Sequence, residues 1–425
     1  MSKLAIDGGA PVRTRPLPTG FLGARLIGEE EKAAVVAALD ARQLSRVGGM
    51  KPPEYVLALE RAVAARVGSS YALAVTSGTA ALKASLAALG VGPGDEVIVP
   101  ALNFISSPEA VLRFEATPVF AEVDDSFGLD PDDFRLKLTP RTKAVMPTHI
   151  FGQACAMDAI MAVAREAGVA VLENCAWSMG ATYHGRAIGT IGDVGIYSLQ
   201  AVKMITAGEG GLVVTSSPLL YERAARFHHH GNLFMSAIPL PPGESGEPLA
   251  PQVEPFVGDA YRLNEISAAV ALSQVPKLDR VLAACRRAKD AIAEGIRGLP
   301  GFRPRPAADP AGNAGNSLGV IFDSAEEAVW WREALAAEGI PVGWVYGGKP
   351  VYLLPQIQEL RPPWTNGEPL LRTPNPPRYG PGLCPRTESL MARALHLVIS
   401  PDYTDDDCAD VVAAFRKVAA ARRPG

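Results

Sequence analysis

The sequence predicts an α/β protein built around a mostly parallel sheet that helices cover on both faces. Between residues 71 and 214, short apolar runs alternate with stretches of helical spacing, a pattern typical of parallel strands joined by helical crossovers. The chain has 425 residues, too many for one small core, so we expect two domains. Ligands bind such sheets beyond the carboxyl ends of the strands, so functional residues are expected in the loops there.

The first part of the chain supplies an arm, the sheet and the helices that cover it. Residues 1–27 are rich in Gly and Pro and predict an extended arm. Helical spacing begins at residue 29, where acidic side chains in the first turn interact favourably with the helix dipole. Helices are expected over residues 29–41, 53–67, 80–88 and 157–167, and strands over 71–75, 96–99, 117–120, 144–146, 169–173, 194–198 and 212–214.

The C-terminal part predicts a smaller α/β unit. Residues 263–298 have the spacing of one or two helices, and a final amphipathic helix follows Thr404, which with Asp407 resembles a capping box. A Pro/Gly-rich insertion at 233–257 is expected to be a loop near a mouth or an interface. We therefore expect an arm and helix over 1–45, a large domain over 46–275 and a small domain over 276–425, with the second boundary placed to within about ten residues.

Composition narrows the possible partners and location. The formal net charge is −4 and no long basic run occurs, so nucleic acid is not an expected partner. The longest apolar stretch, residues 80–91, is interrupted by Lys83 and is too short to span a bilayer. The N-terminus lacks the apolar core of a signal peptide, and the five cysteines show no CxxC spacing, which favours reduced thiols. We expect a cytoplasmic protein without a membrane segment.

Lys203 carries the strongest chemical signal in the chain. It stands five residues after Ser198, which ends a predicted strand. A glycine-rich turn at 208–211 follows and leads into the next strand. A lysine held by a tightly turning backbone suits an amine that forms and re-forms an imine with a cofactor aldehyde. The alternative is a solvated lysine before a hairpin, which is the commoner situation for an isolated lysine.

Three other segments also follow predicted strands. Gly78 and Thr79 open a helix, so they could bind an anion through backbone N–H groups, or merely accompany a helix cap. Asn174 ends a strand and could meet a ring nitrogen, or cap backbone groups in a turn. Phe104 could stack on a flat cofactor, although an aromatic residue in that position more often belongs to the core.

Together these segments resemble the DegT/DnrJ/EryC1/StrS family of sugar aminotransferases, which use pyridoxal 5′-phosphate and have the aspartate-aminotransferase-like fold type I. The resemblance extends nearly end to end, and residues 4–13 and 46–49 are similar to the branch of scyllo-inosose aminotransferases and 3-amino-5-hydroxybenzoate synthases. It implies a large cofactor domain, a smaller C-terminal α/β domain, and a homodimer with shared active sites.

The resemblance also assigns roles to residues. Lys203 matches the lysine that binds the cofactor as an imine, and Ser198 matches a phosphate-binding serine. Residues 258–265 match a stretch that reaches the partner's site, which brings Arg262 into the set. The expected cofactor-binding residues are Gly78, Thr79, Phe104, Asn174, Trp177, Ser198, Lys203 and Arg262.

The sequence departs from the family pattern at three positions. Asn174 replaces the acid that pairs with the pyridine nitrogen, Trp177 replaces a His or Gln near the phenolic oxygen, and Ala260 replaces an Asn. A carboxylate keeps the ring nitrogen protonated, whereas a neutral amide offers only a hydrogen bond. The difference is on the order of 1–2 kcal/mol, which corresponds to roughly tenfold in rate or more.

Three hypotheses follow. The first is an aminotransferase that moves an amino group from L-glutamine or L-glutamate to a keto sugar, cyclitol or related ketone in natural-product biosynthesis, with Lys203 as general acid and base. The second keeps the cofactor but is a lyase, dehydratase, oxidase or carbon–carbon bond-forming enzyme, as the three departures suggest. The third is a non-catalytic binding protein, against which the retained lysine argues.

No metal is expected. His228, His229 and His230 are consecutive, and consecutive residues do not share one face of a helix, so a structural role is favoured over metal binding. Cys175, beside Asn174, is expected to be a buried structural cysteine.

Overall fold

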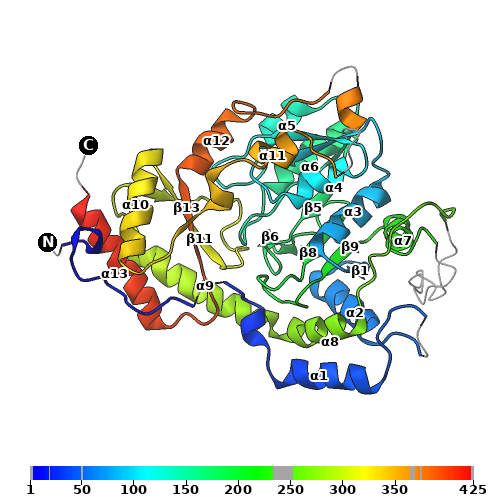
Figure 1. The fold of residues 1–425 in the computed structure, drawn as a ribbon, viewed down its shortest axis with the longest axis horizontal. Helices are drawn as coiled ribbons and strands as arrows, with labels where there is room; N and C mark the ends of the chain where they lie inside the picture. The colour runs from blue at the N-terminus through cyan, green and yellow to red at the C-terminus, as the bar shows by residue number, and fades with distance from the viewer. Residues whose placement is uncertain are drawn as a thin grey trace.

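The computed structural model describes residues 3–18, 20–48, 51–232, 252–363, 369–373 and 376–422. Most of the insertion expected at 233–257 therefore lies outside the described residues. Two groups of elements, each built on its own sheet, lie side by side (Figure 1). No helix in the described ranges combines the length and apolarity that crossing a membrane requires.

The larger sheet has seven strands in the order β1-β9-β8-β5-β4-β2-β3. Neighbouring strands from β3 through β8 pair in parallel, whereas β9 runs antiparallel to both β8 and β1. This confirms the prediction of a mostly parallel sheet. The strands are β1 (Tyr71–Val75), β2 (Glu96–Pro100), β3 (Thr117–Ala121), β4 (Thr142–Val145), β5 (Ala170–Asn174), β8 (Val194–Ser198) and β9 (Gly211–Thr215).

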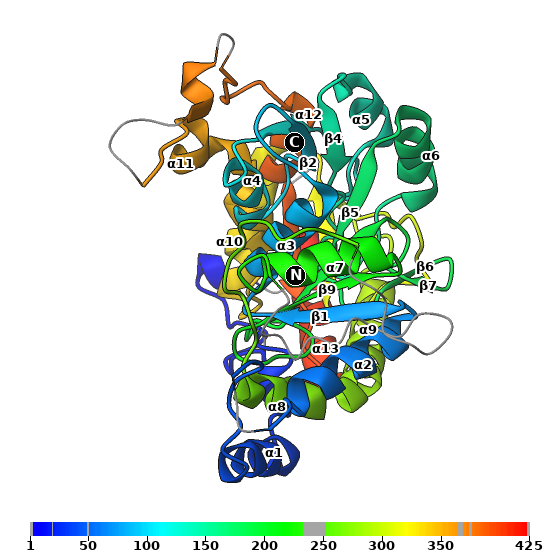
Figure 2. The same ribbon diagram turned by 90° about the vertical axis from the view of Figure 1, so that its right-hand side faces the viewer.

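Helices cover both faces of this sheet because side chains alternate along each strand. Leu73 and Val75 of β1 pack in the core beneath α3, α4 and α7, whereas Ala72 and Ala74 pack in the core on the opposite face, with α2, α5 and α6 (Figure 2). The helices are α2 (Tyr55–Val67), α3 (Gly78–Leu89), α4 (Ser106–Leu112), α5 (Pro131–Lys137), α6 (Met157–Ala167) and α7 (Pro218–Phe227).

The smaller sheet is antiparallel and consists of β10 (Phe302–Pro304), β11 (Ser317–Phe322), β13 (Ala394–Val398) and β12 (Gly343–Trp344), in that order. Trp331 is fully buried against it, with Phe302, Phe322 and Phe415 around the indole. The predicted capping box is present, since Thr404 and Asp407 exchange hydrogen bonds at the start of the last helix. The helices that follow along this part of the chain are α9 (Leu278–Gly295), α10 (Ala325–Ala337), α11 (Pro355–Gln358), α12 (Pro385–Ala392) and α13 (Asp405–Ala421).

The N-terminal segment and the connecting elements complete the chain. Where it is described, the segment before α1 (Glu29–Asp40) contains the short 3₁₀ turns η1 (Ala5–Asp7) and η2 (Ala24–Leu26) and no longer helix or strand. Helix α8 (Glu265–Gln274) packs against α1 and α2 below the large sheet (Figure 1). The remaining elements are β6 (Thr182–Tyr183), β7 (Arg186–Ala187), η3 (Val275–Lys277), η4 (Val345–Gly348), η5 (Val351–Leu353) and η6 (Pro369–Arg372).

Arg46, part of the segment that resembles one family branch, has a structural role here. Its guanidinium is 1% exposed and pairs through two nitrogens with the Glu60 carboxylate. Glu60 also accepts a hydrogen bond from the backbone N–H of Ala74, 2.7 Å away. A buried ion pair fixes geometry more than it adds stability, so this pair secures β1 against α2.

Candidate active site

A cavity of about 400 Å³ lies at the carboxyl ends of β1, β2, β5 and β8, the edge of the sheet at which parallel α/β folds bind ligands. Seven of the eight residues expected from the sequence line it. Arg262 is not among them, and its Nη1 lies 2.8 Å from Nδ1 of His229 in the same chain. The lining includes the expected Gly78, Thr79, Phe104, Asn174, Trp177, Ser198 and Lys203, and also Ser77, Asn103, Thr148, Ala176, Gln200, Glu209 and Tyr346.

One end of the cavity is suited to an anion. Ser77 is the N-cap of α3 and accepts a hydrogen bond from the Ala80 N–H. The next two N–H groups, of Gly78 and Thr79, have no hydrogen-bond partner among the described residues. A Cβ on Gly78 would lie 3.1 Å from Cβ and 3.3 Å from Oγ of Ser198, so glycine lets the serine hydroxyl sit beside the helix start. Free N–H groups at a helix N-terminus together with a hydroxyl form an anion site.

Backbone conformation and close packing explain the glycines in the turn after Lys203. Gly208 has φ of +80°, which glycine adopts without strain. A Cβ on Gly211 would lie 2.3 Å from the carbonyl oxygen of Ser77, a contact that no side chain tolerates. The turn therefore places the start of β9 directly against the N-terminus of α3 and holds the anion-binding end of the cavity in shape.

Lys203 lies within this cavity and is not a solvated surface lysine. Its Nζ is 3.2 Å from the centre of the Trp177 ring, and its backbone is held by hydrogen bonds to Gln200 and Gly23. Burial lowers the pKa of Lys203 to about 7, because removing water penalises the ammonium form. At neutral pH a large fraction of this amine is unprotonated and able to attack a carbonyl.

Asn174 lies at the end of β5 and is 3% exposed. Its Oδ1 accepts a hydrogen bond from the Ala176 N–H (3.1 Å), and its Nδ2 donates to Oγ of Ser107 (3.0 Å). Ser107 in turn bonds to Asn103, whose Nδ2 donates to Oγ1 of Thr148 (2.9 Å). Asn174 thus caps backbone, as one interpretation of the sequence expected, while its side chain also lines the cavity.

Aromatic side chains surround the outer part of the cavity. Phe104 is 51% exposed, so it does not belong to the core, and its ring centre is 6.2 Å from that of Tyr346. Phe151 contacts both Tyr346 (5.9 Å) and Trp177 (5.3 Å). The indole of Trp177 therefore joins an aromatic group with Phe151 and Tyr346. Sequence reasoning missed Tyr346, which reaches the cavity from η4, the turn after β12, with φ of +45°.

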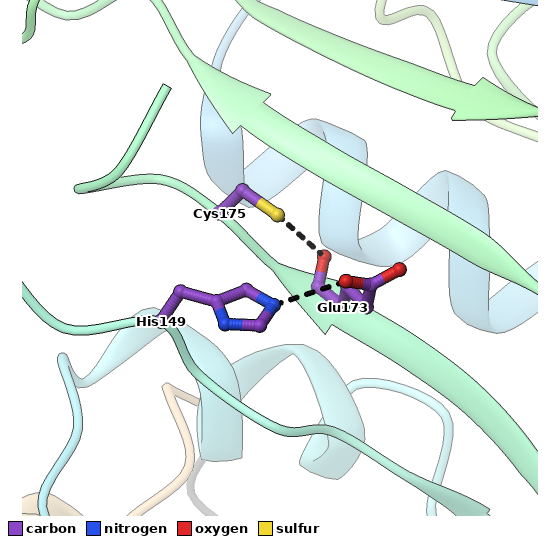
Figure 3. Close-up of side chains that lie close together, drawn as sticks. All are labelled: His149, Glu173 and Cys175. Atoms are coloured by element: carbon purple, nitrogen blue, oxygen red, sulfur yellow. Dashed lines mark hydrogen bonds and ion pairs between the residues drawn. The ribbon is translucent and has the colours of Figure 1, made fainter. Parts of the chain in front are cut away.

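Behind Asn174, on the other face of β5, lies a buried group formed by His149, Glu173 and Cys175 (Figure 3). Nδ1 of His149 accepts from the Cys155 N–H, so its Nε2 carries the proton and donates to Glu173 (3.1 Å). The same carboxylate accepts from three backbone N–H groups, those of Gly189, Ile191 and Gly192, at 2.7–2.8 Å.

The group holds the adjacent loops in place, and its hydrogen bonds leave few free lone pairs that could coordinate a metal. Burial raises the pKa of Cys175 to about 12, which keeps it a thiol, and the Glu173 carboxylate already receives four hydrogen bonds. Of the three consecutive histidines, His228 is hydrogen-bonded to the Ala225 carbonyl and His229 to Arg262. These two rings therefore have different hydrogen-bond partners.

Sequence comparison matches residues 25–416 to the DegT/DnrJ/EryC1/StrS aminotransferase family. The chain is 32% identical to the L-glutamine:2-deoxy-scyllo-inosose aminotransferase of Streptomyces fradiae over 98% of both chains. It is 38% identical to the GDP-perosamine synthase of Caulobacter vibrioides over 64% of this chain and 68% of the relative.

Solved structures give the same result. The structure of DesI with its TDP-sugar product has a TM-score of 0.77 and 30% identity, over 98% of this chain and 96% of that one. 3-Amino-5-hydroxybenzoic acid synthase has a TM-score of 0.78 and 28% identity, over 97% of this chain and all of that one.

Proposed function

This chain belongs to the DegT/DnrJ/EryC1/StrS aminotransferase family, and we propose that it uses pyridoxal 5′-phosphate to aminate a keto sugar, cyclitol or related cyclic ketone. One observation carries the proposal: a single cavity joins the Lys203 amine, with its pKa of about 7, to an anion site at the start of α3. An aldehyde and a phosphate on one small cofactor match these two features.

The residues of the cavity fit the cofactor along its whole length. The N–H groups of Gly78 and Thr79 and the Ser198 hydroxyl would hold the phosphate, Phe104 would cover the ring, and Asn174 would meet the ring nitrogen. Trp177 lies beside the Lys203 amine. Bound there, the cofactor would supply an aldehyde that captures amines and a ring that withdraws electrons from the adjacent carbon.

Lys203 performs the proton transfers in this proposal. Its unprotonated Nζ would hold the cofactor through the aldehyde and would be released when a donor amine takes its place. The freed Nζ would then be the base that takes the proton from Cα of the donor and the acid that returns it. The same acid and base roles of Nζ would serve the amination of the ketone. Burial supports this role because it brings the pKa of the amine near the working pH.

The relatives support the proposed substrates. The Streptomyces fradiae protein is named for L-glutamine and 2-deoxy-scyllo-inosose, so we infer L-glutamine or L-glutamate as the donor. The names of the perosamine synthase and of DesI with its TDP-sugar product point to sugars. We place the reaction in natural-product biosynthesis, in the cytoplasm, and carried out by a homodimer. The matched relatives give no support to a lyase, oxidase or bond-forming activity.

Chemical trapping tests the lysine assignment. Purified protein is incubated with pyridoxal phosphate and reduced with borohydride, and its peptides are examined by mass spectrometry. We expect the cofactor mass on Lys203, and in Lys203→Ala a loss of aminotransferase activity of at least about 10²–10⁴-fold. Cofactor mass on another lysine, with Lys203 unmodified, would contradict the proposal.

A further inference from the structure

We propose that Asn174 donates an amide N–H to the ring nitrogen of the cofactor and thereby keeps that nitrogen unprotonated. The inference rests on the proposed function, because it concerns the cofactor assigned there. An aspartate in the same place would accept a hydrogen bond from a protonated ring nitrogen. The geometry around Asn174 assigns the opposite polarity.

The direction of the hydrogen bonds around Asn174 can be worked out from Asn103. The backbone N–H of Phe104, which can only donate, lies 2.8 Å from Oδ1 of Asn103 and identifies that atom as the oxygen. The Ser107 hydroxyl lies 3.0 Å from the same oxygen, so Ser107 must give it the hydroxyl hydrogen. With its hydrogen used, the Ser107 oxygen can only accept from Asn174, 3.0 Å away.

The other side of Asn174 gives the same orientation. The backbone N–H of Ala176 lies 3.1 Å from the second terminal atom of the amide, which must therefore be the oxygen. Two independent neighbours, Ser107 and Ala176, thus determine which end of the Asn174 amide is nitrogen. An amide rotated by 180° would face a donor with a donor and an acceptor with an acceptor.

One hydrogen of Asn174 remains without a partner. Nδ2 carries two hydrogens, and one is used by Ser107. No acceptor within the described ranges takes the other, although the residue is 3% exposed and lines the cavity. A buried N–H without an acceptor is costlier than a carbonyl oxygen with one bond instead of two. A pyridine nitrogen with its lone pair free is the acceptor that satisfies this group.

The acid that neighbours Asn174 in the sequence does not reverse this preference. The nearest acid along the chain, Glu173, lies on the other face of β5 and is bonded to His149 and three backbone N–H groups. A donated hydrogen bond stabilises the unprotonated ring nitrogen and lowers its pKa. The ring then withdraws electrons less strongly, so more of the work of removing the Cα proton falls to Lys203.

Nitrogen NMR of the holoenzyme measures the ring nitrogen directly. Protein loaded with pyridoxal phosphate carrying ¹⁵N in the ring is titrated from pH 6 to pH 9. In the native protein we expect the chemical shift of unprotonated pyridine throughout. Asn174→Asp should move the signal to the protonated range. Asn174→Ala, which removes the donor, should give a signal that becomes protonated at a higher pH than in the native protein.

Ser107 provides the matched test of positioning. Ser107→Ala removes one of the two neighbours that orient Asn174, so the ring nitrogen should become protonated at a pH between those of the native protein and Asn174→Ala. Ser107→Thr keeps the hydroxyl and should restore the native titration. A merely structural role of Ser107 would change thermal stability without changing the nitrogen signal.

The outcomes separate this inference from the proposed function. A native signal in the protonated range, or identical titrations for the native protein and Asn174→Ala, would overturn the inference while leaving cofactor binding intact. Absence of any protein-bound signal would overturn the proposed function as well. Cofactor bound in the unprotonated form in the native protein, together with protonation at a higher pH in Asn174→Ala, supports both.

Discussion

At the scale of single residues, the sequence predicted the side chains that directly follow strands. Lys203, Ser198 and Asn174 could be found because strand ends and glycine turns leave a local pattern, and all three line one cavity. Tyr346 could not be found, because only packing between the two sheets brings it to Phe104. The direction of each hydrogen bond around Asn174 also has no sequence signal, since it depends on neighbours brought together by folding.

The pKa of Lys203 predicts how the empty protein reacts with its cofactor. Burial lowers this pKa to about 7, so the unprotonated amine predominates above pH 7 and is lost below it. The rate of imine formation with pyridoxal phosphate, followed by stopped-flow absorbance, should rise from pH 5.5 to about 7.5 and then level off.

An ordinary lysine gives a different profile. With a pKa near 10.4, its rate would keep rising through pH 9, and that result would contradict the assigned burial effect. Lys203→Ala serves as the control for reaction at other lysines.

At the scale of elements, the predicted strands of the large sheet agree with the structure to within two residues at each end. The helix expected at residue 80 begins at Gly78 instead, because the Ser77 side chain caps it by accepting a hydrogen bond from the Ala80 N–H. The alternation of strands and helices is set by local apolar spacing. The close approach of β9 to α3 is set by contact across the sheet and was visible only as a run of glycines.

Gly211→Ala tests that close approach. The new Cβ would lie 2.3 Å from the Ser77 carbonyl, so β9 or α3 must move. We expect a loss of about 1–3 kcal/mol in the free energy of unfolding and weaker binding of pyridoxal phosphate.

Gly92→Ala is the matched control, because a Cβ there meets nothing within 4 Å. Denaturant unfolding and cofactor titration of both variants give the comparison. Equal stability and equal cofactor affinity in the two variants would show that the anion site does not depend on this contact.

At the scale of the whole molecule, the cavity lies at the edge of the large sheet, and Tyr346 reaches it from η4 in the C-terminal part of the chain. The expected boundaries near residues 45 and 275 stay predictions, as does the homodimer implied by the family resemblance. Arg262, expected to reach a partner's site, is bonded within its own chain to His229. Length and composition predicted the two-part organisation, whereas assembly depends on surfaces that a sequence pattern does not reveal.

Sedimentation equilibrium tests the assembly. We expect a species of twice the chain mass that does not dissociate at micromolar concentration. If the sites are shared, mixing Lys203→Ala with Arg262→Ala should recover part of the activity that each variant lacks alone. A monomer with full activity would contradict the shared site.

The most direct test of the central claim, that Lys203 anchors a cofactor that accepts an amino group, is the absorbance of the protein loaded with pyridoxal phosphate. Spectra are recorded before and after L-glutamine and L-glutamate, with Lys203→Ala beside the native protein. The account predicts that one donor converts the lysine-bound aldehyde band to the band of the aminated cofactor, and that the variant shows neither the starting band nor the conversion. A native band that neither donor changes would contradict it.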